Sequence, residues 1–415
     1  MTHRAFHADA VLPGDAAPIA DGAVVVDASG IVVEVGPAAS VLPRHAGVRV
    51  ERIRGVVFPG LVNAHTHLEL SGLRGKVAGG AGFVPWLQRL LTTRGEERPE
   101  DDGEAIDAAV AELVAAGTAA VGDVSNSLAT VGALARAGLA GSVFHEVFGL
   151  AREAAMARVE TLERGLDEVA AGWPSRDLVY APSPHTLFTT HPDAVRAVLA
   201  LARRLGVRAS LHLAEHPAER AFLATRTGPM ATLAASMAEA LAAFPVPATD
   251  PVRAARALGA LGPDVLAVHL ADARPDELAL VAESGAPVVA CPRSNLFIEV
   301  RLPPMPAMLA AGIVPALGTD SLASNASLDV LAEARALTDR FPAIAARTLL
   351  EMATTAGARA LGRADLGRIA PGARPGLVAC ALDAEGADPC AAVVRSRPSS
   401  RRWVVRRSPL SSEGT

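Results

Sequence analysis

Two histidines separated by one residue, His65 and His67, end an apolar, β-branched stretch that starts at Val56. In an extended chain, side chains two residues apart point to the same side, so both imidazoles would be directed at one point. Two converging neutral imidazoles are a common beginning of a zinc site. The alternative is a pair of surface histidines on a loop. The apolar run before them favours a metal site at the end of a buried strand.

Five of the eleven histidines fall at or near the predicted carboxyl ends of strands, together with two carboxylates. These residues are His65, His67, His185, His212, His269, Glu215 and Asp320. In a closed barrel of strands and helices, the carboxyl ends of the strands converge on one mouth, where catalytic groups lie. A structural role is the default for any one of these histidines, but their convergence predicts one shared metal site.

Apolar segments that alternate with amphipathic helices must position these groups. Strands are expected at 118–124, 142–147, 178–182, 207–213, 265–270, 287–291 and 313–317, and helices at 104–116, 153–170, 192–206 and 275–285. With the strand before His65, they make eight strand-then-helix units, which predict an α/β fold, the (β/α)8 TIM barrel. An open doubly wound sheet is the alternative, but the chain lacks the glycine-rich phosphate loop typical of such sheets.

The connection 217–264 is much longer than the others and joins a strand to a helix, so it would lie at the barrel mouth. It would either cover the substrate or form a surface insertion. Short strand-like segments stand at both ends of the chain, 23–27 and 30–35 before the barrel, and 376–382 and 402–406 after it. They are too short for a separate core, so the two ends are expected to share one small sheet or sandwich. We therefore predict two units, a small β-sandwich from 1–57 and 366–410, and a barrel from 58–365.

The composition is that of a globular protein, with half of the 415 residues apolar, a fifth charged and a net charge of -5. The sequence has no basic face of the kind that indicates nucleic-acid binding. No apolar run reaches the ~18 residues of a membrane span. The three scattered cysteines argue against a disulfide framework, and the N-terminus lacks the pattern of a secretory signal. We expect a cytoplasmic protein that binds a small molecule, without a nucleic-acid or membrane partner. A homo-oligomer remains open.

His212, Glu215 and His216 also fit the H-x-x-E-H pattern of one metalloprotease class. That chemistry needs both histidines on one helical turn. Here His212 lies in an alternating strand-like run, and Pro217 follows His216 in a position suited to starting a helix. The pattern therefore does not favour a protease.

The segments PGLVNAHTH, HLAE and GTDSLASN, with His269 alone between the last two, resemble the amidohydrolase superfamily and its amino-purine deaminase branch. By that resemblance, four residues would bind one divalent metal ion, usually zinc, with iron as the alternative: His65, His67, His212 and Asp320. The catalytic residues would be Glu215, His269 and Asp320, and His185 would contact the substrate. The family's small β-sandwich is built from both chain ends. The C-terminal PGARPGLVAC lacks the family's usual Asp, a departure that concerns the sandwich and not the chemistry.

The stretches HLELSGLRGK and GFVPWLQRLL are similar to aminodeoxyfutalosine deaminases of menaquinone biosynthesis. Deaminases of S-adenosylhomocysteine and methylthioadenosine are next, but they carry an acidic residue before the tryptophan, where this chain has Val84-Pro85 before Trp86. The resemblance thus implies deamination of a 6-aminopurine nucleoside derivative, aminodeoxyfutalosine first. The alternatives are S-adenosylhomocysteine, methylthioadenosine or adenosine as substrate, and hydrolysis of a cyclic amide or a chloro-triazine. A metal-free binding protein would have lost a ligand, and none is missing.

In the corresponding mechanism, the metal lowers the pKa of water to ~7 and Glu215 protonates the purine ring. Asp320 takes the proton of the water, and His269 orients the attacking oxygen. Glu69 and Ser71 are candidate ribose ligands, and Trp86 is a candidate for stacking on an aromatic ring or for a core position. The benzoate of aminodeoxyfutalosine would need a guanidinium. The candidates for it are Arg74, Arg89 and Arg293.

Overall fold

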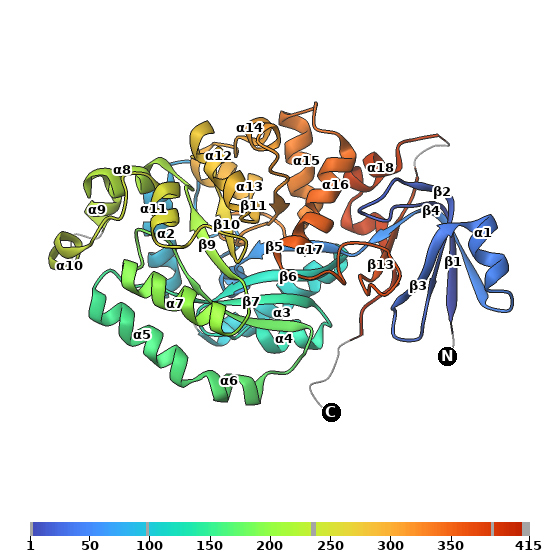
Figure 1. The fold of residues 1–415 in the computed structure, drawn as a ribbon, viewed down its shortest axis with the longest axis horizontal. Coiled ribbons are helices and arrows are strands. Elements are labelled where there is room, and N and C mark those ends of the chain that lie inside the picture. Colours follow the sequence, from blue (N-terminus) through green and yellow to red (C-terminus); the bar gives the residue numbers. More distant parts are fainter. Residues whose placement is uncertain (1–2, 97–98, 234–237, 383–385, 409–415) are drawn as a thin grey trace.

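The computed structural model describes residues 3–96, 99–233, 238–382 and 386–408. Its strands form three sheets, one from the two ends of the chain and two from the segment between them. In Figure 1 the sheet of the chain ends lies at one side of the molecule, and the other strands lie among helices. The predicted unit of 1–57 and 366–410 includes residues 1–2, 383–385 and 409–410, which are outside the described residues.

Both ends of the chain contribute to one six-stranded sheet with the order β14-β13-β4-β1-β2-β3. Its strands are β1 (Arg4–Val11), β2 (Ile19–Val26), β3 (Val32–Pro37), β4 (Arg49–Pro59), β13 (Leu377–Cys380) and β14 (Arg401–Val405). The two ends meet where β13 pairs antiparallel with β4, with Leu377 opposite Pro59. Alternate residues are buried on opposite faces, Phe6 in one apolar cluster and Ala5 in another under helix α1 (Ala38–Arg44). A sheet shared by the two ends is confirmed, and its arrangement as a sandwich stays a prediction.

The middle of the chain forms two parallel four-stranded sheets, ordered β5-β6-β7-β8 and β12-β11-β10-β9. The strands are β5 (Leu61–Thr66), β6 (Thr118–Ser125), β7 (Ala140–Val147), β8 (Leu178–Pro184), β9 (Ala209–Leu213), β10 (Val265–His269), β11 (Val288–Ala290) and β12 (Ala316–Leu317). Every residue of β5, β6, β9 and β10 is buried, as expected for parallel strands covered on both faces. The mixed α/β class and the order of the strands are confirmed.

Hydrogen bonds also join the outer strands of these two sheets at their carboxyl ends. After β12, the N–H of Asp320 donates to the carbonyl of His65 at the end of β5, at 3.1 Å. After β8, the carbonyl of His185 accepts from the N–H of His212 in β9, also at 3.1 Å. The ends that carry the predicted site residues are therefore fixed to one another by the backbone.

Helices follow the strands as the apolar periodicity predicts. Before β9 they are η1 (Leu68–Leu73), α2 (Phe83–Glu96), α3 (Pro99–Ala115), α4 (Val131–Arg136), α5 (Arg152–Arg164), α6 (Leu166–Gly172) and α7 (Pro192–Arg204). After β9 they are α8 (Pro217–Thr225), α9 (Pro229–Leu233), α10 (Ala238–Ala243), α11 (Pro251–Ala257), α12 (Pro275–Ser284), α13 (Pro292–Glu299), α14 (Met305–Ala310), α15 (Val330–Arg340), α16 (Ala346–Met352), α17 (Thr355–Ala360), α18 (Pro389–Arg395) and η3 (Pro398–Ser400). The single helix predicted over 153–170 is wrong. It divides at Gly165, because glycine costs about 1 kcal/mol in a helix interior.

The long connection 217–264 contains α8 to α11. A cleft of about 700 Å³ lies between α2 and the first two helices of this connection, α8 and α9. Phe83, Pro217 and Pro229 are among its lining residues. Whether the connection covers the substrate stays a prediction. Within the described part of the chain, no helix combines the length and the apolar character needed to cross a membrane.

Candidate active site

Three imidazoles meet at the carboxyl ends of β5 and β9. Nε2 of His67 lies 3.2 Å from Nε2 of His65 and 3.2 Å from Nε2 of His212. Two nitrogen ligands on a tetrahedral zinc ion, each ~2.0–2.1 Å from the metal, are about 3.3–3.4 Å apart. The spacing of the three nitrogens therefore fits a single small cation between them.

A carboxylate completes this group from the end of β12. Oδ1 of Asp320 lies 3.5 Å from Nε2 of His67 and 3.8 Å from Nε2 of His65. Its other oxygen, Oδ2, accepts hydrogen bonds from the hydroxyls of Ser294 (2.5 Å) and Ser324 (3.1 Å). These bonds fix the plane of the carboxylate and leave Oδ1 directed at the imidazoles.

The environment of two of these imidazoles, His65 and His212, favours the neutral ring. Burial, with the neighbouring imidazoles as a second cause, lowers the pKa of His65 well below its ordinary value and the pKa of His212 to about 3. Burial raises the pKa of Asp320, but His67, His269 and the bond from Ser294 outweigh it, so the net direction is down. Neutral imidazoles and an ionised carboxylate have free lone pairs, so the donor set fits a divalent metal ion.

Glu215 and His269 stand beside this cluster. Nε2 of His269 lies 3.7 Å from Oε1 of Glu215, and both side chains are buried. Burial and the nearby charge of Asp320 raise the pKa of Glu215 well above its ordinary value, while burial lowers the pKa of His269 to about 4. His269 is therefore a neutral imidazole at neutral pH, and Glu215 keeps its proton to a higher pH than an ordinary glutamate. Such a carboxyl group is suited to donating a proton to a substrate.

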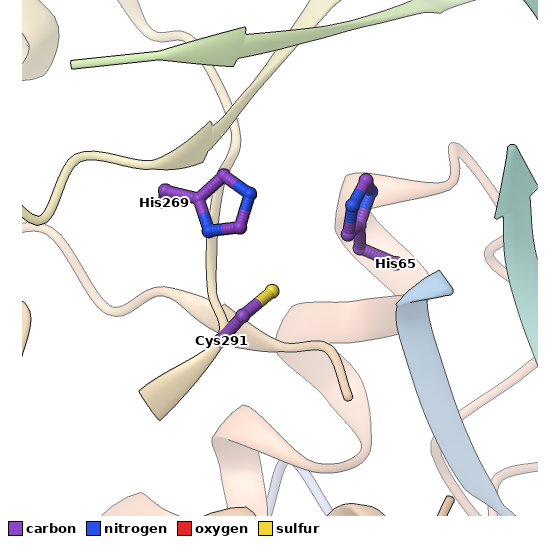
Figure 2. A group of neighbouring side chains, drawn as sticks. All are labelled: His65, His269 and Cys291. Carbon is purple, nitrogen blue, oxygen red and sulfur yellow. The ribbon is translucent and has the colours of Figure 1, made fainter. Parts of the chain in front are cut away.

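A second group of possible ligands shares two of these histidines. Figure 2 shows the thiol of Cys291, at the end of β11, beside the rings of His65 and His269. One ligand atom from each of the three lies within 4.8 Å of the others. Burial raises the pKa of the Cys291 thiol well above its ordinary value, and a thiol binds metal only as the thiolate. The three-imidazole and Asp320 set is therefore the better metal site.

His185 lies next to the cluster rather than in it. Its ring centroid is 5.1 Å from that of His212, and its carbonyl lies 3.1 Å from Nδ1 of His212. Glu146, at the end of β7, places Oε1 3.7 Å from the same Nδ1. An acceptor on the far nitrogen orients a histidine whose other nitrogen binds metal.

The metalloprotease pattern is not formed. His212 lies in strand β9, whereas His216 is the N-cap of α8, where its Nδ1 accepts a hydrogen bond from the N–H of Glu219. The two histidines thus share no helical turn, as the position of Pro217 predicts.

Glu69 and Ser71, the predicted ribose ligands, are both buried in η1. The carboxylate of Glu69 accepts hydrogen bonds from the hydroxyls of Ser125 and Ser127 and from the N–H groups of Asn126 and Ser127. It therefore holds the loop after β6 in this structure. The hydroxyl of Ser71 is buried and has no hydrogen-bond partner among the described residues. Their contact with ribose stays a prediction.

The other predicted substrate ligands are engaged in protein contacts. Trp86 is buried against Phe83, and its Nε1 donates to the carbonyl of Ala323 at 3.4 Å. Arg293 donates to the hydroxyl of Ser327 and lies 3.8 Å from Glu333. Of the two other arginines considered, Arg74 pairs with Glu112 and Arg89 donates to the carbonyl of Ala78. The contacts of these three guanidiniums described above are with residues outside the imidazole cluster.

Four residues at the site were not predicted. They are Ser294, Ser324, Glu146 and Cys291. Glu146 lies at the end of β7, Cys291 and Ser294 follow β11, and Ser324 follows β12. Position after a strand is therefore the only signal in the sequence that could have identified them.

The family model described as "Amidohydrolase family" matches residues 56–401. The chain is 32% identical over 385 residues to the 5-methylthioadenosine/S-adenosylhomocysteine deaminase of Nitratidesulfovibrio vulgaris, covering 89% of this chain and 82% of that protein. It is 33% identical over 323 residues to the aminodeoxyfutalosine deaminase of Deinococcus radiodurans, covering 75% of each. Both names support a hydrolase that acts on carbon–nitrogen bonds.

Among solved structures, the zinc-bound adenosine deaminase of Xanthomonas campestris is similar with a TM-score of 0.80 and 26% identity, covering 98% of this chain and 92% of that one. Amidohydrolases generally use a divalent metal ion, which agrees with the donor set described above. The extent of these matches and the resemblance of the motifs lead to one conclusion: this chain belongs to the amidohydrolase family.

Proposed function

We propose that the protein is a metal-dependent hydrolytic deaminase that converts a 6-aminopurine nucleoside derivative to its 6-oxo product and ammonia. The observation that carries the proposal is the buried Glu215, grouped with His269 and Asp320 beside three converging imidazoles. An aminopurine carbon is attacked by water only when the adjacent ring nitrogen receives a proton. A carboxyl group whose pKa is raised by burial is suited to that step.

His65, His67, His212 and Asp320 would hold the ion, which we propose to be zinc, with iron as the alternative. The bound ion would supply an activated water at neutral pH. Glu215 would donate its proton to the ring nitrogen. Asp320 would accept a proton from the water through the oxygen that the serines leave free and pass it to the departing ammonia. His269, 3.7 Å from Glu215, would orient the attacking oxygen.

Two substrates remain candidates. The relative from D. radiodurans supports the predicted aminodeoxyfutalosine, and the relative from N. vulgaris supports methylthioadenosine or S-adenosylhomocysteine. These nucleosides share the base and the sugar and differ at the 5′ substituent. A cyclic amide has no ring nitrogen that Glu215 would have to protonate, so the raised pKa of Glu215 favours deamination over amide hydrolysis. A chloro-triazine does have ring nitrogens next to the reacting carbon, and the assay below distinguishes it by chloride release.

Ammonia release from a panel of nucleosides tests the proposal. The purified, zinc-loaded protein would be assayed with aminodeoxyfutalosine, methylthioadenosine, S-adenosylhomocysteine, adenosine and guanine, and chloride release with a chloro-triazine. We expect ammonia from at least one nucleoside. Release of chloride alone would refute the proposed reaction and leave the metal site standing.

We further propose that the eight parallel strands close into one barrel over 58–365, beside a sandwich of 1–57 and 366–410. The bonds between His65 and Asp320 and between His185 and His212 support closure. The protein is proposed to act in the cytoplasm.

A further inference from the structure

Three aromatic rings form a row from the imidazole cluster toward solvent. The ring of His185 lies 5.1 Å from that of His212, and the ring of Phe148 lies 6.3 Å from that of His185, edge to face. Phe148 immediately follows β7 and is 41% exposed, which is unusual for a phenylalanine at a strand end of the site. Its side chain is therefore partly exposed, two ring contacts away from His212.

An arginine lies over the same ring. The Cζ of Arg158, in α5, is 4.6 Å from the ring centroid of Phe148, and its Nη1 donates to the Phe148 carbonyl. The acidic residues nearest in sequence, Glu153 and Glu160, are not at the helical spacing of three or four residues that makes ion pairs. Among the described residues, no carboxylate lies within ion-pair distance of this guanidinium. Arg152, one and a half turns earlier, is paired with Asp193 at 2.7 Å.

The backbone fixes this rim. The N–H of Gly149 donates to the carbonyl of Thr189 at 2.8 Å, and the carbonyl of Gly149 accepts from the N–H of His191 at 2.8 Å. The loops after β7 and β8 are thus tied together beside the cluster. These bonds fix the backbone beside Phe148, and the Phe148 carbonyl in turn holds the Arg158 guanidinium, which lowers the entropy cost of binding a ligand.

We propose that Phe148 and Arg158 bind an aromatic carboxylate on the 5′ substituent of the substrate. The inference rests on the proposed nucleoside deaminase function. An aromatic ring of the ligand would lie against Phe148 in an offset or edge-on arrangement. The guanidinium has five N–H donors and uses one on the Phe148 carbonyl, so its remaining donors can hold a carboxylate with two parallel bonds. This assigns to Arg158 the role for which the sequence offered Arg74, Arg89 and Arg293.

The test compares Arg158→Met with wild type on two substrates, aminodeoxyfutalosine and methylthioadenosine, which lacks the carboxylate. We expect KM for aminodeoxyfutalosine to rise about tenfold or more at a similar kcat, because a hydrogen bond to a charged group is lost. KM for methylthioadenosine should stay within about twofold, since that substrate offers nothing for the guanidinium. Arg158→Lys should lie between, because lysine keeps the charge without the planar fork.

Arg164→Met is the matched control, an arginine on the last turn of the same helix, away from the ring. It should leave both substrates unchanged, as should Arg152→Met. Phe148→Leu should raise KM for aminodeoxyfutalosine by about threefold, the loss of one aromatic contact. An equal rise for both substrates in Arg158→Met, no rise at all, or a larger effect from Arg152→Met would overturn the inference.

Failure of the proposed function would be seen separately, as absence of ammonia release from either substrate by the wild-type holoenzyme. In that case, benzoate is the probe, and its binding is followed by ligand-observed NMR with wild type and Arg158→Met. Benzoate bound by wild type and released by the substitution would support the site. Equal binding to both proteins, or none to wild type, would refute it.

Discussion

Replacing Glu215 by glutamine tests the central chemical step with little change in the fold. Glu215 is buried, and its pKa is raised well above the ordinary value by burial and by Asp320, so burial favours its uncharged form. Glutamine has nearly the same shape as that uncharged form. The substitution therefore keeps the volume of the site and the favoured charge, but it removes the transferable proton.

The size of the effect follows from the role assigned to that proton. General acid catalysis by a positioned group contributes about 10²–10⁴ in rate, which corresponds to about 3–5 kcal/mol in activation free energy. We expect kcat of Glu215→Gln to fall by this factor. Metal content should be unchanged, because Glu215 is not among the four proposed ligands. The assay is ammonia release at saturating substrate, with metal measured in the same samples.

Glu219→Gln is the matched control. Glu219 is also fully buried, burial raises its pKa to about 8, and its Oε2 accepts the N–H of Glu215 at 3.0 Å. It shares the burial and the raised pKa of Glu215 but is not grouped with the proposed metal ligands, so kcat should stay within about threefold of wild type, as for a change that leaves the reacting groups in place. Near-normal turnover by Glu215→Gln, or loss of metal from it, would refute the acid role. Equal losses in the two variants would point to packing rather than proton transfer.

Three further predictions follow from the same contacts. Removal of metal by a chelator should abolish activity and lower the melting temperature without unfolding the protein at 25 °C, and added zinc should restore both, as followed by activity and circular dichroism. Ser294→Ala should raise the dissociation constant for zinc about 10–100-fold, because it removes the 2.5 Å bond that orients Asp320, with an unchanged melting temperature of the metal-free protein. Arg401→Met should cost about 1.5–3 kcal/mol in the free energy of unfolding by urea, because Asp329 loses its bonds of 2.8 and 3.0 Å to Arg401 and keeps the one from Arg335 at 2.7 Å. Burial raises the pKa of Asp329, but the bonds and charges of Arg401 and Arg335 outweigh it and bring the pKa below the ordinary 3.8. The stabilisation by ionised Asp329 is therefore complete above about pH 3.8, the pKa of the unfolded state, and is lost as the pH falls through the lower pKa of the folded state. If the free energy of unfolding of the wild type did not fall with pH in this range, this account would be contradicted.

The residues that converge were predictable because their positions follow from the order of strands and helices. His65, His212 and Asp320 each lie at or just beyond the end of an apolar segment, so a parallel arrangement of strands is enough to bring them together. Contacts across the site were not predictable, because Ser294, in α13, meets Asp320 only in the folded chain, 26 residues away. In the same way, nothing local in the sequence shows that Arg74 is already paired with Glu112, 38 residues away. The division of the predicted helix at Gly165 has a local cause, the low helix propensity of glycine. The apolar pattern continued across Gly165, so the pattern alone predicted one helix.

The backbone at the site gives a reason to expect the metal ligands to be held in place before the metal binds. Of the eight non-glycine residues with positive φ in the described structure, four lie at the ends of β9, β10 and β12: Ala214, His269, Leu270 and Asp320. Such conformations cost of order 1–3 kcal/mol each and persist only where other contacts enforce them. Here the enforcing contacts link neighbouring strand ends, from the N–H of Asp320 to the carbonyl of His65 and from the N–H of Leu270 to the carbonyl of Leu213. None of these bonds involves a metal ligand atom, so they remain when the ion is removed. The site is thus a property of the folded chain, which is why chelation is expected to lower stability only by the free energy of metal binding.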